Sequence, residues 1–326
     1  MGAAASSEGP VLITGAAGFA GSHLAERLAA TTRLVCWSRE APAPGLVPSA
    51  EWQQIDLLDR EHVRSAVTAL RPARIYHLAG VPHVAGSWDA TAPTLAGNVL
   101  ATHYLFDALR RAGVRARVLV TASATVYAMS DRPIAEDGAI APGSPYALSK
   151  LAQEMRALRA TAEDGLDVVV VRPFNHTGAR QAPAFAAPSF ARQIAKIERG
   201  EQPPVIRAGN LTPRRDLSDV RDVVRAYEAL MERGASGAIY NVASGVGRSI
   251  GDILGALVAR ARVKVTIETD PALLRPNDTA ALVGDCGRLQ RDTGWTTQIP
   301  FDQTLDDLLA YWRAQSAPGS RLPAGT

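Results

Sequence analysis

A glycine-rich turn near the start of the chain constrains the fold more than any other feature. The apolar run Val11–Thr14 leads into Gly15, Gly18 and Gly21, and helix-forming residues follow at once. Between a strand and a helix, the first glycine permits a tight turn. The second lets backbone N–H groups approach a pyrophosphate, and the third lets the helix pack closely on the sheet. The pattern therefore predicts a dinucleotide site, with a purely structural turn as the alternative. Its predicted contacts are Gly15, Gly18, Phe19 and Ala20.

The first 170 residues alternate short β-branched runs with longer helical patterns. This alternation implies right-handed βαβ crossovers, and so an α/β fold with a Rossmann-type doubly wound parallel sheet. The expected strands are Pro10–Thr14, Arg33–Trp37, Arg74–Leu78, Arg117–Thr121 and Asp167–Arg172, with a further strand before Asp56. The expected helices are Gly18–Ala30, His62–Leu70, Thr94–Ala112 and Tyr146–Asp164.

The regular alternation of strand and helix patterns ends after Arg172. Residues 175–188 hold two prolines and one glycine with few periodic apolar residues, which predicts an active-site loop. We expect a nucleotide-binding domain over residues 10–172 and a smaller α/β substrate lobe over most of residues 173–315. A disordered tail is expected over residues 1–9 and a mobile tail over 316–326. The later elements are predicted as helices Ser189–Arg199, Asp219–Arg233, Ile250–Ala261 and Thr304–Ala314, and strands Val205–Arg207 and Ile239–Val242.

Composition excludes several other classes of protein. The chain has 326 residues, of which 47% are hydrophobic and 21% charged, so most of it is expected to be folded. No apolar run approaches the roughly 18 residues of a membrane span. The 35 cationic residues are scattered, which argues against a nucleic-acid partner. Two cysteines make no disulfide framework, no Cys/His spacing fits a metal, and the start of the chain lacks a secretory pattern, so a cytoplasmic location is expected.

The end of the second expected strand should select the cofactor. NAD binders usually place an acid there for the adenosine ribose, but this chain has Ser38 and Arg39. Arginine can pair with a 2′-phosphate and serine can donate a hydrogen bond, so NADP(H) is favoured over NAD(H). Asp56 and Leu57 are predicted to lie against the adenine, and a helix N-cap is the alternative for Asp56.

A candidate catalytic group lies further along the chain. Tyr146 and Lys150 are four residues apart on an expected helix, which places both side chains on one face. An ammonium near a phenol stabilises the phenolate and lowers the pKa of the tyrosine. Ser123 follows the Arg117–Thr121 strand at the carboxyl edge of the sheet, where its hydroxyl could bind a reacting carbonyl oxygen.

Together, the glycine turn, Ser123, Tyr146 and Lys150 resemble the extended short-chain dehydrogenase/reductases that act on nucleotide sugars. The likeness extends over residues 10–315 and includes Leu78, Ala79 and Gly80 as cofactor contacts. It also includes the segment Arg172–Asn175, in which the family's asparagine meets the substrate diphosphate. The resemblance further implies a homodimer formed through the helices over residues 94–112 and 146–164.

Several segments after residue 174 are similar to bacterial GDP-4-keto-6-deoxymannose reductases. The likeness implies a GDP-linked 4-keto-6-deoxyhexose as substrate. Arginines suit such a ligand because a guanidinium binds phosphate oxygens in pairs. The implied substrate contacts are Ser87, Thr125, Asn175, Arg192, Arg215, Arg275 and Asp278.

Thr125 helps to choose among reactions. The sugar 4,6-dehydratases that the chain resembles carry a glutamate at this position, and threonine cannot replace it as an acid or base. The expected reaction is therefore reduction of the C4 ketone of GDP-4-dehydro-6-deoxy-D-mannose to GDP-D-rhamnose or its C4 epimer. A nucleotide-sugar 4-epimerase, a GDP-mannose 4,6-dehydratase and a non-catalytic NADP-binding sensor remain as alternatives.

Overall fold

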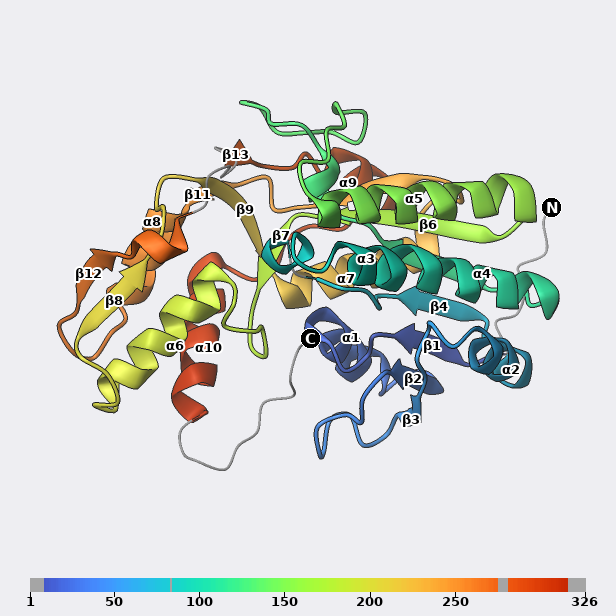
Figure 1. The fold of residues 1–326 in the computed structure, drawn as a ribbon, viewed down its shortest axis with the longest axis horizontal. Helices are drawn as coiled ribbons and strands as arrows, with labels where there is room; N and C mark the ends of the chain where they lie inside the picture. The colour runs from blue at the N-terminus through green and yellow to red at the C-terminus, as the bar shows by residue number, and fades with distance from the viewer. Residues whose placement is uncertain (1–8, 83, 275–280, 316–326) are drawn as a thin grey trace.

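The computed structural model describes residues 9–82, 84–274 and 281–315. Figure 1 shows a large sheet packed between helices and, beside it, a smaller lobe. The lobe contains α6 (Ala186–Glu198), α8 (Ile250–Val258) and α10 (Phe301–Ala314). Apart from Gly9, the two predicted tails lie outside the described residues.

The large sheet has seven parallel strands in the order β10-β6-β5-β4-β1-β2-β3. Chain order reverses at β1, whose neighbours are β2 and β4, and ligands of open α/β sheets bind at the carboxyl ends of strands beside such a point. The predicted α/β fold is confirmed. The strands are β1 (Val11–Thr14), β2 (Leu34–Ser38), β3 (Glu51–Gln54), β4 (Arg74–His77), β5 (Arg117–Thr121), β6 (Asp167–Pro173) and β10 (Ile239–Val242).

Alternating side chains of each central strand enter two different cores. In β1, Val11 and Ile13 pack with one cluster while Leu12 packs with the other. Burying an aliphatic side chain of this kind contributes about 1.5–3 kcal/mol, so strands that are apolar on both sides hold helices on both faces. One face carries α1 (Phe19–Leu28), α7 (Val220–Arg233) and α9 (Gly287–Thr293), and the other carries α2 (Arg60–Leu70), α4 (Ala101–Arg111) and α5 (Pro145–Asp164).

The lobe has its own core and two small sheets. Ile194, Leu254 and Leu308 bring α6, α8 and α10 together with no exposed surface. One sheet joins β7 (Asn175–Thr177), β9 (Arg214–Asp219), β11 (Gly247–Ser249) and β13 (Ala281–Leu282), and the other pairs β8 (Val205–Ala208) with β12 (Thr266–Thr269). Because β10, α7 and α9 return to the large sheet, part of the segment 173–315 completes the nucleotide-binding layer.

Two predicted segments have a different structure, and the sequence prediction did not include β9, β11, β12, β13 or α9. The helix expected over residues 94–112 is broken into α3 (Thr91–Leu95), a π turn named η2 (Ala96–Leu100) and α4. The expected loop after Arg172 begins with the strand β7, which pairs with β9. Both departures arise from contacts with segments distant in the sequence, which no local pattern records.

Candidate active site

The glycine turn has the shape that a dinucleotide requires. Gly15 has φ +72°, and a Cβ there would lie 2.7 Å from the Ala79 backbone; at Gly21 it would lie 2.2 Å from the Gly15 oxygen. Gly18 is the N-cap of α1, whose first turn carries no acid. The unpaired N–H groups and the positive end of the helix dipole therefore suit a pyrophosphate. Phe19 and Ala20 begin α1, as the predicted contacts require.

The predicted ribose-binding residues lie at the carboxyl end of β2. Ser38 is buried, and its hydroxyl donates to the Glu40 carbonyl at 2.6 Å. The Arg39 side chain is 60% exposed and lies 3.7 Å from the Glu40 carboxylate, an acid that the sequence analysis did not weigh. An exposed pair of this kind contributes only about 0–1 kcal/mol, so Arg39 can exchange it for a phosphate.

Asp56 and Leu57 lie between β3 and α2. Leu57 is buried, and the Asp56 carboxylate accepts from Leu58 N at 2.9 Å. The α2 N-cap is Asp59, whose side chain accepts from His62 N, so the N-cap alternative for Asp56 is wrong.

Lys150 is buried behind the candidate nicotinamide position. Its Nζ donates to the Thr121 carbonyl and to Gln153 Oε1, both at 2.8 Å. Burial lowers the pKa of Lys150 to about 7. A Cβ on Gly80, one of the predicted cofactor contacts after β4, would lie 3.6 Å from Nζ. The structure therefore brings the segment Leu78–Gly80 next to the lysine.

Tyr146 is in the first turn of α5, which Ser144 caps by accepting from Ala147 N. Burial raises the pKa of the Tyr146 phenol, and a hydrogen bond from Ser123 opposes that rise. The Ser123 hydroxyl also lies 2.9 Å from the Thr125 hydroxyl. The predicted serine, tyrosine and threonine thus meet at one place, and the serine also caps the short helix after β5.

Ser87, a predicted substrate contact, lies beside the first turn of α5. It is fully buried, its hydroxyl donates to the Val84 carbonyl at 2.7 Å, and it accepts from Tyr146 N at 3.1 Å. Its single hydroxyl proton is used within the protein, so Ser87 could meet a substrate only as an acceptor. The hydrogen bond from Tyr146 N to Ser87 therefore holds the backbone of the first turn of α5 in place.

Sequence reasoning missed Asn98, which the π turn η2 presents to the site. Its buried side chain accepts from Val81 N at 2.8 Å and donates to the Ser149 hydroxyl at 2.8 Å. A Cβ on Gly80 would lie 2.5 Å from Asn98 Oδ1. A single asparagine within a helical pattern gives no signal in the sequence. In the structure, a π turn inside a helix often marks a functional site.

The loop after β6 contacts the cofactor turn through aromatic rings. His176 stacks on Phe19 with ring centroids 5.6 Å apart and planes 8° apart, and His23 makes a T-shaped contact with Phe19, with centroids 5.7 Å apart. Arg180 has φ +71°, a left-handed backbone that favours glycine, and forms a two-pronged ion pair with Glu26 of α1 at 2.7 Å. Asn175, a predicted substrate contact, is exposed and begins β7.

Two arginines face each other across the small sheet. The antiparallel register of β9 and β11 places Arg215 opposite Arg248, so both side chains lie on one face. In the structure the Arg248 guanidinium carbon lies 4.1 Å from the centre of the Phe301 ring, and Arg215 donates to the Arg214 carbonyl at 2.9 Å. Asp216 is buried and accepts from the backbone N–H groups of Ser244, Gly245 and Gly284, which fixes β9 beneath the pair. Arg248 was not identified from the sequence.

The remaining predicted substrate contacts are less central. Arg192 is exposed on α6, with its guanidinium carbon 5.9 Å from the Trp312 ring of α10. Arg275 and Asp278 lie outside the described residues.

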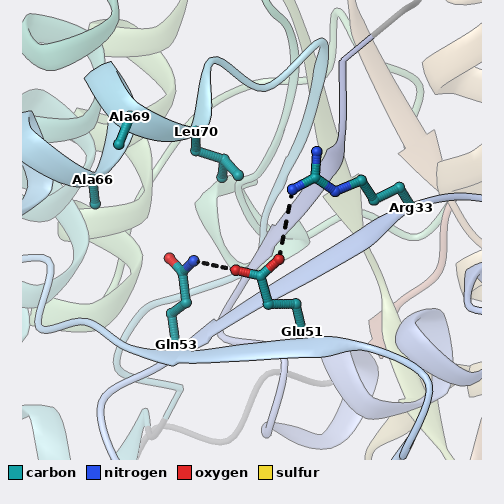
Figure 2. A pocket seen from close by; sticks show the side chains of 6 residues that line it. All are labelled: Arg33, Glu51, Gln53, Ala66, Ala69 and Leu70. Atoms are coloured by element: carbon teal, nitrogen blue, oxygen red, sulfur yellow. Dashed lines mark hydrogen bonds and ion pairs between the residues drawn. The ribbon is translucent and has the colours of Figure 1, made fainter.

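A shallow pocket elsewhere does not compete with this site. Figure 2 shows Arg33, Glu51 and Gln53 lining it with three apolar residues of α2. Arg33 precedes β2 and Glu51 begins β3, so this pocket lies at the amino ends of the strands, opposite the catalytic edge. Within the described ranges there is no cluster of metal-ligating side chains, and none of the helices is both apolar and long enough to cross a bilayer.

The switch-point glycine turn and the Ser123, Tyr146 and Lys150 group define a short-chain dehydrogenase/reductase of the extended type. The chain belongs to the GDP-mannose 4,6 dehydratase family, whose model matches residues 12–308. It is 35% identical to GDP-6-deoxy-D-mannose reductase of Pseudomonas aeruginosa, covering 94% of this chain and 97% of the relative. These matches confirm the predicted resemblance to nucleotide-sugar enzymes.

Solved structures match over nearly the same range. The structure of RMD from Pseudomonas aeruginosa complexed with NADPH is 33% identical with a TM-score of 0.83, and the match covers 94% of this chain and all of that one. The Thermus thermophilus UDP-glucose 4-epimerase complex with NAD is 26% identical with a TM-score of 0.84, covering 94% of this chain and 99% of that one. Both of these structures hold a nicotinamide dinucleotide, which is the class of cofactor that the sequence predicts for this chain.

Proposed function

We propose that the protein reduces the C4 ketone of GDP-4-dehydro-6-deoxy-D-mannose, with NADPH as the preferred cofactor. The observation that carries the proposal is the contact between Ser123 and Tyr146, with Lys150 one turn further along α5. Thr125 lies beside Ser123, at the position where the related dehydratases carry a glutamate. This set moves one hydride and one proton. The 35% identical reductase supports the choice of a GDP-linked sugar.

In the proposed reaction, C4 gains a hydride and its oxygen gains a proton, so the ketone becomes an alcohol. The reduced nicotinamide, when bound, supplies the hydride. Tyr146 donates the proton as general acid, and the Ser123 hydroxyl polarises the ketone through a hydrogen bond. The Lys150 ammonium lowers the pKa of the phenol and donates to the cofactor ribose. The product is GDP-D-rhamnose or its C4 epimer, according to the face attacked.

The substrate diphosphate is assigned to the lobe. Arg215 and Arg248, opposed across β9 and β11, form a cationic pair for phosphate oxygens, and Asn175 contributes an amide from β7. Thr125 is placed beside the sugar because its hydroxyl adjoins that of Ser123. Arg192, Arg275 and Asp278 remain predicted contacts of the nucleotide.

The test is incubation with GDP-4-keto-6-deoxymannose and NADPH, with loss of reduced cofactor followed by absorbance and the sugar identified by NMR. Stoichiometric formation of a 6-deoxy alcohol supports the proposal. Dehydration of GDP-mannose would instead support a 4,6-dehydratase, which the family name suggests but Thr125 disfavours. Tightly retained dinucleotide with interconversion at C4 would support an epimerase, and binding without turnover a sensor.

Preference for NADPH is expected to depend on Arg39. Replacing Arg39 by Asp removes a charge-assisted hydrogen bond of about 1.5–3 kcal/mol and introduces repulsion, so kcat/KM for NADPH should fall by about tenfold or more relative to NADH. The matched control is Arg33→Asp, because Arg33 is also an exposed arginine beside β2 but lies at its amino end. An unchanged NADPH-to-NADH ratio in Arg39→Asp would remove this residue from the site.

The protein is also proposed to form a homodimer through α5 and the adjoining η2–α4 segment. Leu100, Leu148 and Met155 are 45%, 51% and 57% exposed there, and Leu148 and Met155 lie two turns apart on α5. A second copy packed against this face by a twofold axis would cover them. Met155→Glu is expected to lower the mass measured by sedimentation to that of a monomer, whereas Val263→Glu on the lobe should not. A wild-type monomer would contradict the proposal.

The cytoplasmic location stays a prediction.

A further inference from the structure

A chain of buried polar side chains lies behind Lys150. Gln153 Oε1 accepts from Lys150 Nζ, and Gln153 Nε2 donates to Thr102 Oγ1, each at 2.8 Å. Thr102 Oγ1 lies 2.8 Å from His77 Nε2, and His77 Nδ1 lies 2.7 Å from Thr14 Oγ1. Gln153, Thr102, His77 and Thr14 are all fully buried. The chain therefore joins the catalytic lysine to β1, the strand that leads into the cofactor turn.

The hydrogen-bond directions in this chain are determined by Thr102. Its single hydroxyl proton is donated to the Asn98 carbonyl at 2.7 Å, so its oxygen can only accept from its other two partners. Gln153 therefore presents its amide nitrogen to Thr102 and its oxygen to Lys150. Because the Thr102 oxygen can only accept, His77 donates to it from Nε2, and a neutral ring then accepts at Nδ1 from the Thr14 hydroxyl. Burial and the Lys150 charge lower the pKa of His77 to about 3, so the ring is neutral.

The surroundings of the Lys150 ammonium carry little opposing charge. β5 supplies the Thr121 carbonyl, β4 supplies neutral His77, and the η2–α4 segment supplies Asn98 and Thr102. On α5 itself the titratable neighbours are Tyr146 and Glu154. Glu154 is bound in an ion pair with Arg172 at 2.5 Å. Within the described residues, the side chain that directly accepts from Lys150 is thus an uncharged amide.

We infer that Gln153 is a positioning residue, which holds the Lys150 ammonium in place with a neutral acceptor so that its full charge acts on Tyr146 and the cofactor. An ammonium has three protons, of which Thr121 and Gln153 take two. The third is left for the cofactor side. A carboxylate at position 153 would orient the ammonium equally well but would offset its charge. The catalytic role of Lys150 in this inference rests on the proposed function.

Two substitutions at Gln153 separate charge from orientation. Gln153→Glu places a carboxylate on Lys150, so the phenolate of Tyr146 is less stabilised and its pKa should rise by about one unit. The alkaline limb of kcat/KM for ketone reduction should move to higher pH by the same amount. Gln153→Met removes the acceptor without adding a charge, so the ammonium loses its orientation while the pKa of Tyr146 should stay close to its wild-type value. The alkaline limb should then stay near that of wild type, with kcat reduced about tenfold and a raised KM for NADPH.

The pKa of Tyr146 can also be measured without substrate. The ultraviolet absorbance of each protein during a pH titration, minus that of the same protein carrying Tyr146→Phe, reports ionisation of this phenol. The phenol of Tyr227 on α7 also faces Tyr146, but burial and Tyr146 hold the pKa of Tyr227 well above its usual range. This readout distinguishes failure of the inference from failure of the proposed reaction. If wild type does not reduce the ketone, the titration still decides whether Gln153→Glu and Gln153→Met move the phenol differently.

Thr102 provides an independent variant if Gln153 substitutions fail to fold. Thr102→Val removes the hydroxyl that fixes the glutamine amide and should reduce kcat, whereas Thr102→Ser should restore both kcat and the pH profile. Gln290→Glu on α9, whose amide contacts Cys286, controls for adding a carboxylate elsewhere and should leave the profile unchanged. Equal pH profiles and phenol titrations for wild type, Gln153→Glu and Gln153→Met, whatever their melting temperatures, would overturn the inference.

Discussion

Replacing Tyr146 by phenylalanine is expected to lower kcat for ketone reduction by about 10²–10⁴-fold, the usual contribution of a positioned general acid. The change removes one hydroxyl and keeps the ring. The Tyr146 backbone remains held by Ser87, and the helix N-cap at Ser144 is untouched. The fold and the affinity for the GDP-sugar should therefore stay close to those of the wild type. Steady-state kinetics with NADPH measures the first effect, and calorimetric titration with a GDP-sugar measures the second.

The matched control for this substitution is Tyr311→Phe, because Tyr311 is a partly buried tyrosine on α10 in the lobe core. It should retain wild-type kcat. A Tyr146→Phe enzyme that turns over at near the wild-type rate would show that another group delivers the proton. A loss confined to KM would instead indicate that the phenol binds substrate equally in the ground and transition states.

The sequence was sufficient to predict the large sheet because its central strands are apolar runs with alternate residues in two cores, whereas the edge strand β3 reads Glu-Trp-Gln-Gln. Val168 and Val170 enter one core while Val169 and Val171 enter the other, which is the signature of a strand covered by helices on both faces. The small lobe strands lack that signature. β9 reads Arg-Arg-Asp-Leu-Ser-Asp, and it is held by Asp216 and by pairing with three short strands. Local periodicity contains no record of such contacts.

The sequence predicts those site residues whose separation along the chain, or place at the end of a strand, already brings them together. Tyr146 and Lys150 are one helical turn apart, and Ser123 follows a strand at the carboxyl edge of the sheet. The supporting residues could not be found in this way. Thr102 and His77 reach Lys150 only through hydrogen bonds between segments 25 to 51 residues apart. Ser87 lies near the site, where its hydroxyl donates to Val84 and accepts from Tyr146 N, and its contact with a substrate stays a prediction.

Glu154 is the position where one substitution is expected to cost the most stability. It forms an ion pair with Arg172 in which Nε and the Nη nitrogen meet its two oxygens at 2.8 and 2.5 Å. The side chains are 3% and 4% exposed. Glu154→Ala leaves a guanidinium buried without its carboxylate, so the free energy of unfolding should fall by about 3–5 kcal/mol. Urea denaturation followed by circular dichroism measures the change.

A surface pair on the same helix gives the comparison. Arg159 and Glu163 also form an ion pair, but their side chains are 66% and 53% exposed, so Glu163→Ala should cost only about 0–1 kcal/mol. Replacing both Glu154 and Arg172 by methionine should recover much of the lost stability, because no charge is then left buried. If Glu154→Ala costs no more than Glu163→Ala, then water or another group compensates Arg172. In that case the ion pair that joins α5 to β6 does not fix the helix bearing Tyr146 and Lys150.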